Sequence, residues 1–270
     1  MLQAVLLLNP NPLWGRKLVV IGDSLTTCPT VEKSYPSKIA ARNNMVLVHN
    51  GRNGERLCED TVDVPSCLNS YTNDIPKDAD FILCQIGSSD VNKWQEDVAN
   101  SVSDTDMSTS TFKGCYNNLI VGLRTNYPNA KICMVLSNNW GSNLGEKSED
   151  TWAQNATREM TQWQKVQCQR LNLFAFDPVE DTMGFTCHFK SYPTNGITIT
   201  SSQISDEELD WYDKTKRYIG TDHSWFDESS NSWIFQTQYM MDNQRTSETG
   251  NEIIATFLEE WMKELLCSSK

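Results

Sequence analysis

A serine in a small polar turn is the residue of this sequence with the clearest capacity for chemistry. Ser24 follows Gly22 and Asp23, and this turn comes directly after the apolar run from Leu18 to Ile21. A serine at the end of a buried strand can act as a nucleophile, and its own N–H can face an oxyanion. The alternative is a turn in which Asp23 and Ser24 only cap the next helix. The residues that other turns bring to Ser24 decide between these interpretations.

Further polar turns follow the other apolar runs. The turn from Asn50 to Gly54 follows a second run, and the turn from Gly87 to Asp90 follows a third. The polar segment Asp242–Arg245 precedes the last predicted helix. Because the carboxyl ends of strands in an open α/β sheet collect ligands and chemistry, we expect these segments to gather around Ser24.

Short apolar runs alternate with amphipathic helical patterns up to about residue 177. Strands are predicted at residues 17–22, 45–49, 81–86, 132–136 and 173–176. Helices are predicted at about 35–43, 112–126, 152–166 and 252–266. This alternation predicts an α/β fold, a three-layer αβα sandwich with a parallel five-strand sheet of flavodoxin-like type.

The chain is predicted to form one domain. Residues 1–16 read as an extended lead-in, and residues 17–270 as the α/β domain. Within it, residues 57–77 look irregular and residues 95–111 look like an acidic surface excursion. The stretch at about 178–240 is an aromatic-rich insertion. Its aromatic side chains either form a sugar-stacking platform or simply pack a lid over the sheet.

The charge excludes two classes of partner. With 23 basic and 35 acidic residues, the formal net charge is −12. An acidic chain repels nucleic-acid phosphates and anionic membranes, so we expect no nucleic acid and no membrane as partner. No apolar run is long enough to span a bilayer, and the run from Val5 to Leu8 is too short for a signal peptide.

The cysteines favour a reducing compartment. There are nine, an odd number, without a Cys-x-x-Cys pair. Cys84, Cys133 and Cys168 fall in apolar or helical patterns, which is typical of buried free thiols. A bridge between Cys58 and Cys67 is the alternative. Reduced cysteines indicate that the protein is made in the cytoplasm. Its final location stays open, and one alternative is that it becomes a component of a virion.

Taken in order, the four polar segments resemble the motifs of the SGNH hydrolases, also called the GDSL esterase family. The resemblance covers about residues 17 to 266, apart from the aromatic insertion. Gly22-Asp-Ser-Leu-Thr26 looks like the nucleophile motif, and Asn50-Gly-Arg-Asn-Gly54 is similar to the second motif. Ile86-Gly-Ser-Ser-Asp90 stands where the family has Gly-x-Asn-Asp. The segment from Asp242 looks like the family's Asp-x-x-His motif before the closing helix.

The resemblance implies a role for each of these positions. Ser24 would be the nucleophile and Asp242 the acid of the catalytic triad. The oxyanion hole would be formed by Ser24, Gly54 and Ser89, with Ser89 in the place of the family's Asn. The family's catalytic His is replaced by Arg245, whose pKa above about 12 prevents it from acting as a base.

The departure at Arg245 leaves several alternatives for the general base. His223 is the candidate, since it lies in the insertion expected to cover the site. His49, at the end of the second strand, is interpreted as structural, and His188 has no metal-ligand spacing around it. Lys93 and Asp90 are weaker candidates for the base.

Substrate contacts and partners are expectations of the same kind. Arg245, Asp23 and Asp90 are the candidate substrate-binding residues. The guanidinium of Arg245 could hold an anionic group such as a carboxylate or sulfate. We expect no metal and no cofactor. The expected substrate is a small ester or an acylated carbohydrate.

Three hypotheses for the function follow. The first is an ester hydrolase of the carboxylesterase or carbohydrate deacetylase class, with an acyl-enzyme at Ser24 and a rerouted base. The second is a degenerate member that binds a glycan or an acidic ligand without turnover. The third is a structural or attachment module of a larger assembly, of the phage tail or adhesion type.

Overall fold

The structure is a computed structural model. It describes residues 11–27, 33–58, 66–137, 147–178, 191–194, 197–200, 225–227, 232–234 and 248–267. The side chains of residues 147–155, of the four short strands between 191 and 234, and of two further helical positions, 158 and 249, are not described.

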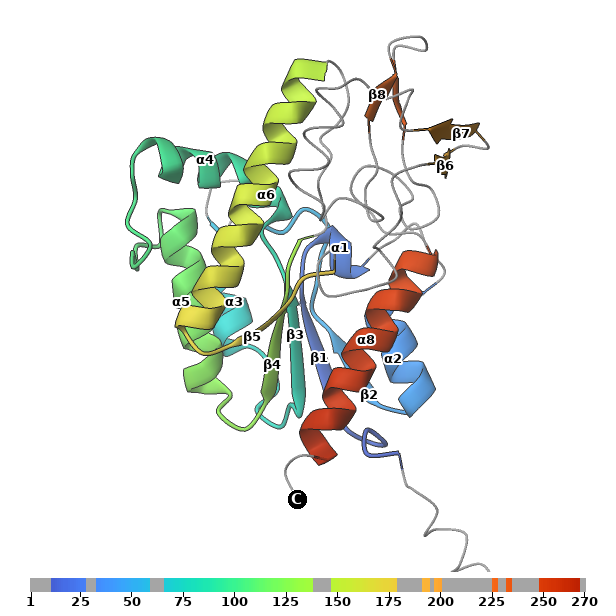
Figure 1. Cartoon of the computed structure of the whole chain (residues 1–270). Helices are drawn as coiled ribbons and strands as arrows, with labels where there is room; N and C mark the ends of the chain where they lie inside the picture. Colours follow the sequence, from blue (N-terminus) through green and yellow to red (C-terminus); the bar gives the residue numbers. More distant parts are fainter. Residues whose placement is uncertain are drawn as a thin grey trace, which may run out of the picture.

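A five-stranded sheet forms the centre of the fold (Figure 1). Its strands are β1 (Lys17–Gly22), β2 (Val46–His49), β3 (Phe81–Gln85), β4 (Lys131–Val135) and β5 (Phe174–Phe176). They pair in the order β2-β1-β3-β4-β5, and every pair is parallel. The predicted parallel five-strand sheet is therefore confirmed, and each predicted strand agrees with the observed one to within one residue at each end.

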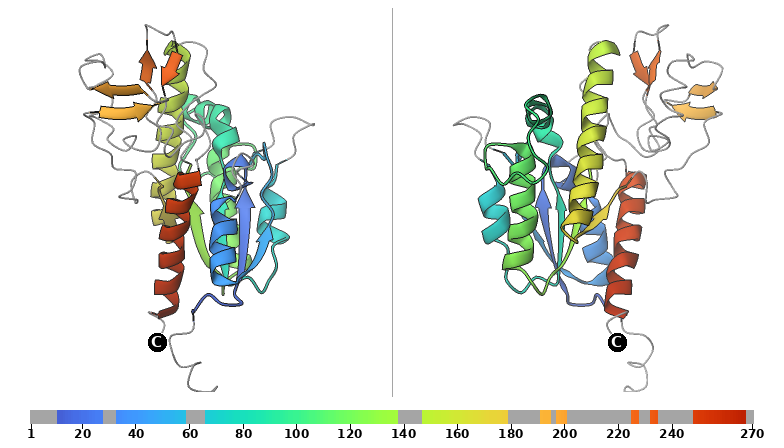
Figure 2. Two further views of the ribbon diagram at one scale, coloured as in Figure 1. Left: turned by 90° about the vertical axis from the view of Figure 1, so that its right-hand side faces the viewer. Right: turned by 60° about the vertical axis from the view of Figure 1, so that its left-hand side comes forward.

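Helices cover both faces of the sheet (Figures 1 and 2). The helices α2 (Tyr35–Asn43) and α8 (Glu248–Cys267) cover one face. The other face is covered by α3 (Leu68–Asn73), α4 (Val91–Ala99), α5 (Phe112–Asn126) and α6 (Lys147–Arg170). Successive side chains of a strand point to opposite faces, so β1 sends Leu18 and Val20 to the first core and Val19 and Ile21 to the second. This explains why the central strands are continuously apolar.

The two helices on the first face are joined along their length. Lys38 pairs with Glu248 and Glu252, and Arg42 pairs with Glu252 and Glu259. Beneath these partly exposed pairs, Ile254, Ala255, Leu258 and Met262 of α8 are buried against the sheet. The predicted final amphipathic helix is confirmed, and it begins at Glu248, the residue that the sequence placed in or near its first turn.

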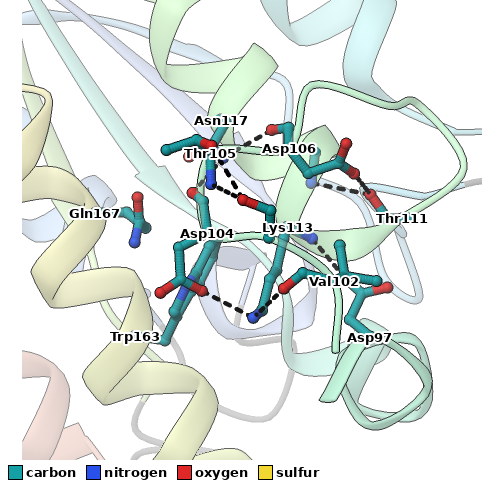
Figure 3. Close-up of polar contacts among 12 residues, drawn as sticks. Asp97, Val102, Asp104, Thr105, Asp106, Thr111, Lys113, Asn117, Trp163 and Gln167 are labelled. Atoms are coloured by element: carbon teal, nitrogen blue, oxygen red, sulfur yellow. Dashed lines mark hydrogen bonds and ion pairs between the residues drawn. The ribbon is translucent and has the colours of Figure 1, made fainter. Parts of the chain in front are cut away.

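The predicted surface excursion begins as a helix. Residues 91–99 form α4, whose Trp94 and Asp97 are buried. The following loop is tied to α5 by the buried Lys113, whose ammonium donates to the Val102 carbonyl and to Asp104, each at 2.8 Å (Figure 3). Asp104 also accepts a bond of 2.8 Å from the Trp163 indole of α6. The loop is thus part of the packed domain.

Two further segments differ from the sequence expectation. The stretch expected to be irregular contains α3, a helix of six residues with Tyr71 and Thr72 buried. In the predicted extended lead-in, residues 12–15 form a turn, and Leu13 is fully buried in the first core. The lead-in is therefore packed on the domain from at least this residue.

The seven cysteines among the described residues are free thiols, as the sequence indicated. Cys84, Cys133 and Cys168 are buried, and so are Cys58 and Cys67, which form no disulfide. Of the aromatic-rich insertion, the structure describes two antiparallel strand pairs. They are β6 (Ser191–Thr194) with β7 (Ile197–Thr200), and β8 (Trp225–Asp227) with β9 (Ser232–Ile234). None of the described helices has the length and hydropathy needed to cross a membrane.

Candidate functional site

Three of the predicted turns meet at the carboxyl edge of the sheet. Asp23 N–H donates to the Gln85 carbonyl at 3.1 Å, so the turn after β1 is bonded to the end of β3. Arg52 N–H donates to the Gly22 carbonyl at 3.0 Å, which joins the turn after β2 to the same point. These bonds hold the segments that carry Ser24, Gly54 and Ser89 around the carboxyl end of β1.

Ser24 is the first residue of α1 (Ser24–Thr27) and is partly exposed. The preceding Asp23 caps this short helix, since its Oδ1 accepts a hydrogen bond of 3.0 Å from Leu25 N–H. The capping interpretation is therefore confirmed for Asp23. Ser24 lies partly exposed at the start of the helix, and its role as nucleophile stays a prediction.

Asp23 is completely buried, and it ties the first turn to the third. Its Oδ2 accepts bonds from Ser88 N–H at 3.2 Å and from the Ser88 hydroxyl at 2.5 Å. Burial raises the pKa of Asp23 to about 6, because the bonds from Ser88 and Leu25 only partly offset the loss of solvation.

Asp90 plays the matching role between the third turn and the segment after the second. Its carboxylate accepts the backbone N–H groups of Leu57 at 2.9 Å and Cys58 at 3.0 Å. Burial raises the pKa of Asp90 to about 6, and the negative charge of Asp23 acts in the same direction. With 0% and 1% exposure, Asp23 and Asp90 have no surface for the substrate contact that the sequence suggested. Their place in the structure is to hold the turns together.

The end of β1 requires a glycine. Gly22 has φ of +152°, and a Cβ atom there would lie 2.1 Å from the Gln85 carbonyl oxygen. The Gly22 carbonyl accepts a bond of 2.8 Å from the Tyr71 hydroxyl of α3, in addition to the one from Arg52. Tyr71 was not anticipated from the sequence, because α3 was not.

The two predicted oxyanion residues beyond Ser24 lie on the turns beside it. Gly54 is exposed and has φ of +73°, which favours glycine. Ser89 is partly exposed, in the short turn of 3₁₀ helix Ser88–Asp90. The neighbouring Ser88, not singled out from the sequence, faces inward to Asp23. A Ser-Ser pair indicates a turn, but does not tell which hydroxyl is buried.

His49 is held by two hydrogen bonds and has a structural place. Its Nδ1 accepts from Gly51 N–H at 3.3 Å, and its Nε2 lies 3.2 Å from the Thr26 carbonyl oxygen. Both ring nitrogens are therefore in use within the protein, which fits the interpretation of His49 as structural. Of the weaker base candidates, Lys93 pairs with Glu96 at 2.9 Å on α4, and Asp90 is buried.

Four predicted site residues lie outside the described residues. They are Asp242, Arg245, His223 and the alternative His188. The triad acid and the general base therefore stay predictions. Within the ranges described, no group of three His, Cys, Asp or Glu side chains could hold a metal ion.

A polar hollow lies on the outer side of the second turn. Its volume is about 250 Å³, and it is lined by His49, Asn50, Gly51, Arg52, Glu55, Ser70, Tyr71 and Asp74. The hollow adjoins the carboxyl edge of the sheet, because residues of the second turn line it. A larger groove of about 580 Å³ lies between α3 and α5, away from the carboxyl edge of the sheet.

Comparison with known proteins identifies the fold. No family model matches the sequence, and no curated protein matches it significantly. A solved structure of a protein from Lactobacillus plantarum is similar with a TM-score of 0.59 at 17% identity, over 93% of this chain and 98% of that one. A GDSL-like lipase from Bacteroides thetaiotaomicron is similar with a TM-score of 0.52 at 9% identity, over 93% of this chain and 89% of that one. The chain therefore has the fold of the GDSL, or SGNH, hydrolases.

Proposed function

We propose that this protein is a serine ester hydrolase that removes O-acyl groups from a carbohydrate, with Ser24 as the nucleophile. The observation that carries the proposal is the position of Ser24. It starts α1 at the carboxyl end of β1, beside the turns that bear Gly54 and Ser89. The GDSL-type fold supports the same reaction class, although fold alone does not fix activity.

In the proposed reaction, the Ser24 hydroxyl attacks the carbonyl carbon of the ester while a base takes its proton. The resulting oxyanion would be held by the N–H groups of Ser24 and Gly54, with Ser89 in support. Collapse of this intermediate expels the alcohol, which takes the proton, and leaves an acyl group on Ser24. Water then releases the acid by the same steps in reverse.

The base of this reaction is assigned to His223, oriented by an acidic neighbour or by Asp242. Arg245 stands where an SGNH hydrolase has its histidine, and we propose that its guanidinium binds an anionic group of the substrate. No cofactor and no metal ion takes part in this scheme. Ser89 stands where an SGNH hydrolase has the asparagine whose amide donates to the oxyanion. If the serine hydroxyl does not replace that donor, the reaction is slower by up to about 10²–10³.

Arg245 and Ser89 favour a second candidate function. A protein that has lost the base and one oxyanion donor can keep the scaffold to bind a glycan or to serve as an attachment module of a larger assembly. In this case Ser24 would carry no activated hydroxyl, and the site would bind an acylated or acidic sugar without turning it over.

Hydrolysis and covalent labelling separate the two functions. We would measure release from p-nitrophenyl acetate and from an O-acetylated xylo-oligosaccharide, and label the protein with a fluorophosphonate probe read by peptide mass spectrometry. Hydrolysis and labelling that disappear in Ser24→Ala, but persist in Ser103→Ala on an exposed loop, would support the hydrolase. Equal rates in wild type and Ser24→Ala, with no labelled Ser24 peptide, would refute it. Restoration of turnover by Arg245→His would then identify a lost base.

A further inference from the structure

The His49 imidazole lies between the two segments that carry the proposed reaction centre. On one side its Nε2 is 3.2 Å from the carbonyl oxygen of Thr26, in the short helix that starts with Ser24. On the other side its Nδ1 is 3.3 Å from the N–H of Gly51, in the turn that ends with Gly54. One side chain therefore connects the nucleophile segment to the oxyanion segment.

These two contacts fix the tautomer of the ring. Gly51 N–H is a donor, so Nδ1 must be the unprotonated acceptor. Thr26 offers a carbonyl oxygen, so Nε2 must carry the hydrogen. A neutral ring with its proton on Nε2 makes both bonds at the same time, which no shorter or apolar side chain does.

Close packing at Gly51 shows that the connection leaves no spare space. A Cβ atom at Gly51 would lie 2.3 Å from Thr26 Oγ1 and 3.0 Å from His49 Cε1. Thr26 is itself completely buried, and its hydroxyl donates to the Asp23 carbonyl at 2.8 Å. The turn, the ring and α1 are therefore in direct contact at this point.

A second, exposed link runs parallel to the first. The Thr27 hydroxyl donates to Asn53 Oδ1 at 2.6 Å. Unlike His49, this pair joins the outer surfaces of α1 and the turn, where water competes for both partners. It supplies a comparison within the same two segments.

We infer that His49 is a positioning residue, which sets the distance and angle between Ser24 and the Gly54 N–H by bonding to both of their segments. This inference rests on the proposed function for its catalytic consequence. It assigns to His49 no proton transfer with the substrate, because both of its nitrogens are committed to the protein.

Three substitutions at His49 separate the effect of its bond to Gly51 from the effect of its bond to Thr26. The amide of His49→Asn reaches as far as Nδ1 and keeps the bond to Gly51, while the amide of His49→Gln reaches as far as Nε2 and keeps the bond to Thr26. His49→Phe removes both bonds and keeps a ring of similar size. Val46→Ala, at the exposed start of the same strand, is the control and should leave activity unchanged.

The expected result is a loss in kcat with little change in KM. His49→Phe should lower kcat for p-nitrophenyl acetate by about tenfold or more, because small misplacements of reacting groups are costly. Asn and Gln should each recover part of that loss, and Thr27→Val should lower kcat less than His49→Phe. A kcat for His49→Phe within about twofold of wild type overturns the inference, as does a loss confined to KM.

Two measurements on the hydrogen bonds of His49 to Thr26 and Gly51 do not depend on catalysis. Imidazole ¹⁵N chemical shifts of the wild-type protein should report the proton on Nε2, and a proton on Nδ1 overturns the inference. Amide exchange at Gly51 should accelerate about five- to tenfold in His49→Gln and His49→Phe but not in His49→Asn. If wild type hydrolyses no ester, the proposed function fails, and these two measurements still decide whether His49 joins the segments.

Discussion

The burial of Asp90 makes an unusual prediction for the pH dependence of stability. Its pKa is about 6 in the folded protein, against 3.8 for an ordinary aspartate. Because the folded state holds the proton up to higher pH, the contribution of this group to stability is fully present below pH 3.8. It is lost as the pH rises through about 6. Most structural carboxylates act in the opposite sense.

The magnitude follows from these two pKa values. Between pH 5.0 and pH 7.5, deprotonation favours the unfolded state over the folded one by about 1.4 kcal/mol. Asp90→Asn removes the titration. Its amide oxygen can accept only one of the two N–H groups of Leu57 and Cys58 comfortably, which costs about 1–3 kcal/mol at pH 5.0. This cost should shrink by about 1.4 kcal/mol at pH 7.5, where the wild-type carboxylate is charged.

Urea unfolding followed by tryptophan fluorescence measures both values. Asp104→Asn is the control, because the bond from Lys113 lowers the pKa of the exposed Asp104 below its usual range. Its effect on the free energy of unfolding should therefore be nearly the same at pH 5.0 and at pH 7.5. An Asp90→Asn cost that is equal at the two pH values, or larger at pH 7.5, would refute the reasoning, since it would mean that hydrogen bonding outweighs burial at this carboxyl.

Two more pairs of substitutions test the architecture around the site by urea unfolding. Gly22→Ala should lower the free energy of unfolding by about 1–3 kcal/mol more than Gly54→Ala does. Both glycines have positive φ, but only at Gly22 would a Cβ atom lie 2.1 Å from a β3 backbone oxygen. Equal losses for the two substitutions would contradict this. Lys113→Met should lower the free energy of unfolding by about 1–3 kcal/mol, since the buried ammonium bonds to Asp104 and to a carbonyl oxygen. Lys93→Met, on the surface, should lower it by less than about 0.5 kcal/mol. A Lys113→Met cost as small as that of Lys93→Met would show that the loop after α4 does not depend on this contact.

The sheet could be predicted from the sequence because its strands are buried on both faces. Continuous apolar runs between polar turns have few other interpretations, and parallel pairing follows from the helical patterns between them. The two missed helices lack such a signal. In α4 the buried side chains are Trp94 and Asp97, and an inward aspartate breaks the apolar period. In α3 only Tyr71 and Thr72 are buried, in a helix of less than two turns.

The location of the site in the fold could be predicted from the sequence, but the contacts of its side chains could not. Glycines and small polar residues after successive strands located the turns, since these turns must lie at one edge of a parallel sheet. Residue types do not reveal which carboxyl is buried. Asp23 and Asp90 look like ligands for a substrate. In the fold, however, Asp23 accepts the Ser88 N–H, and Asp90 accepts the N–H groups of Leu57 and Cys58. The role of His49 likewise depends on a carbonyl oxygen and an N–H group that only the folded chain brings near.

The pairing of α2 with α8 has a consequence for the order of folding. Tyr35 N–H at the start of α2 donates to the Asn251 amide oxygen at 2.8 Å, across a separation of 216 residues. During synthesis from the amino terminus, all five strands of the sheet therefore exist before α8 is made. Until then Leu18, Val20 and Leu83 have only part of their cover. The nascent chain presents a half-covered apolar sheet face, which is the kind of surface that chaperones bind and that aggregates when α8 is absent.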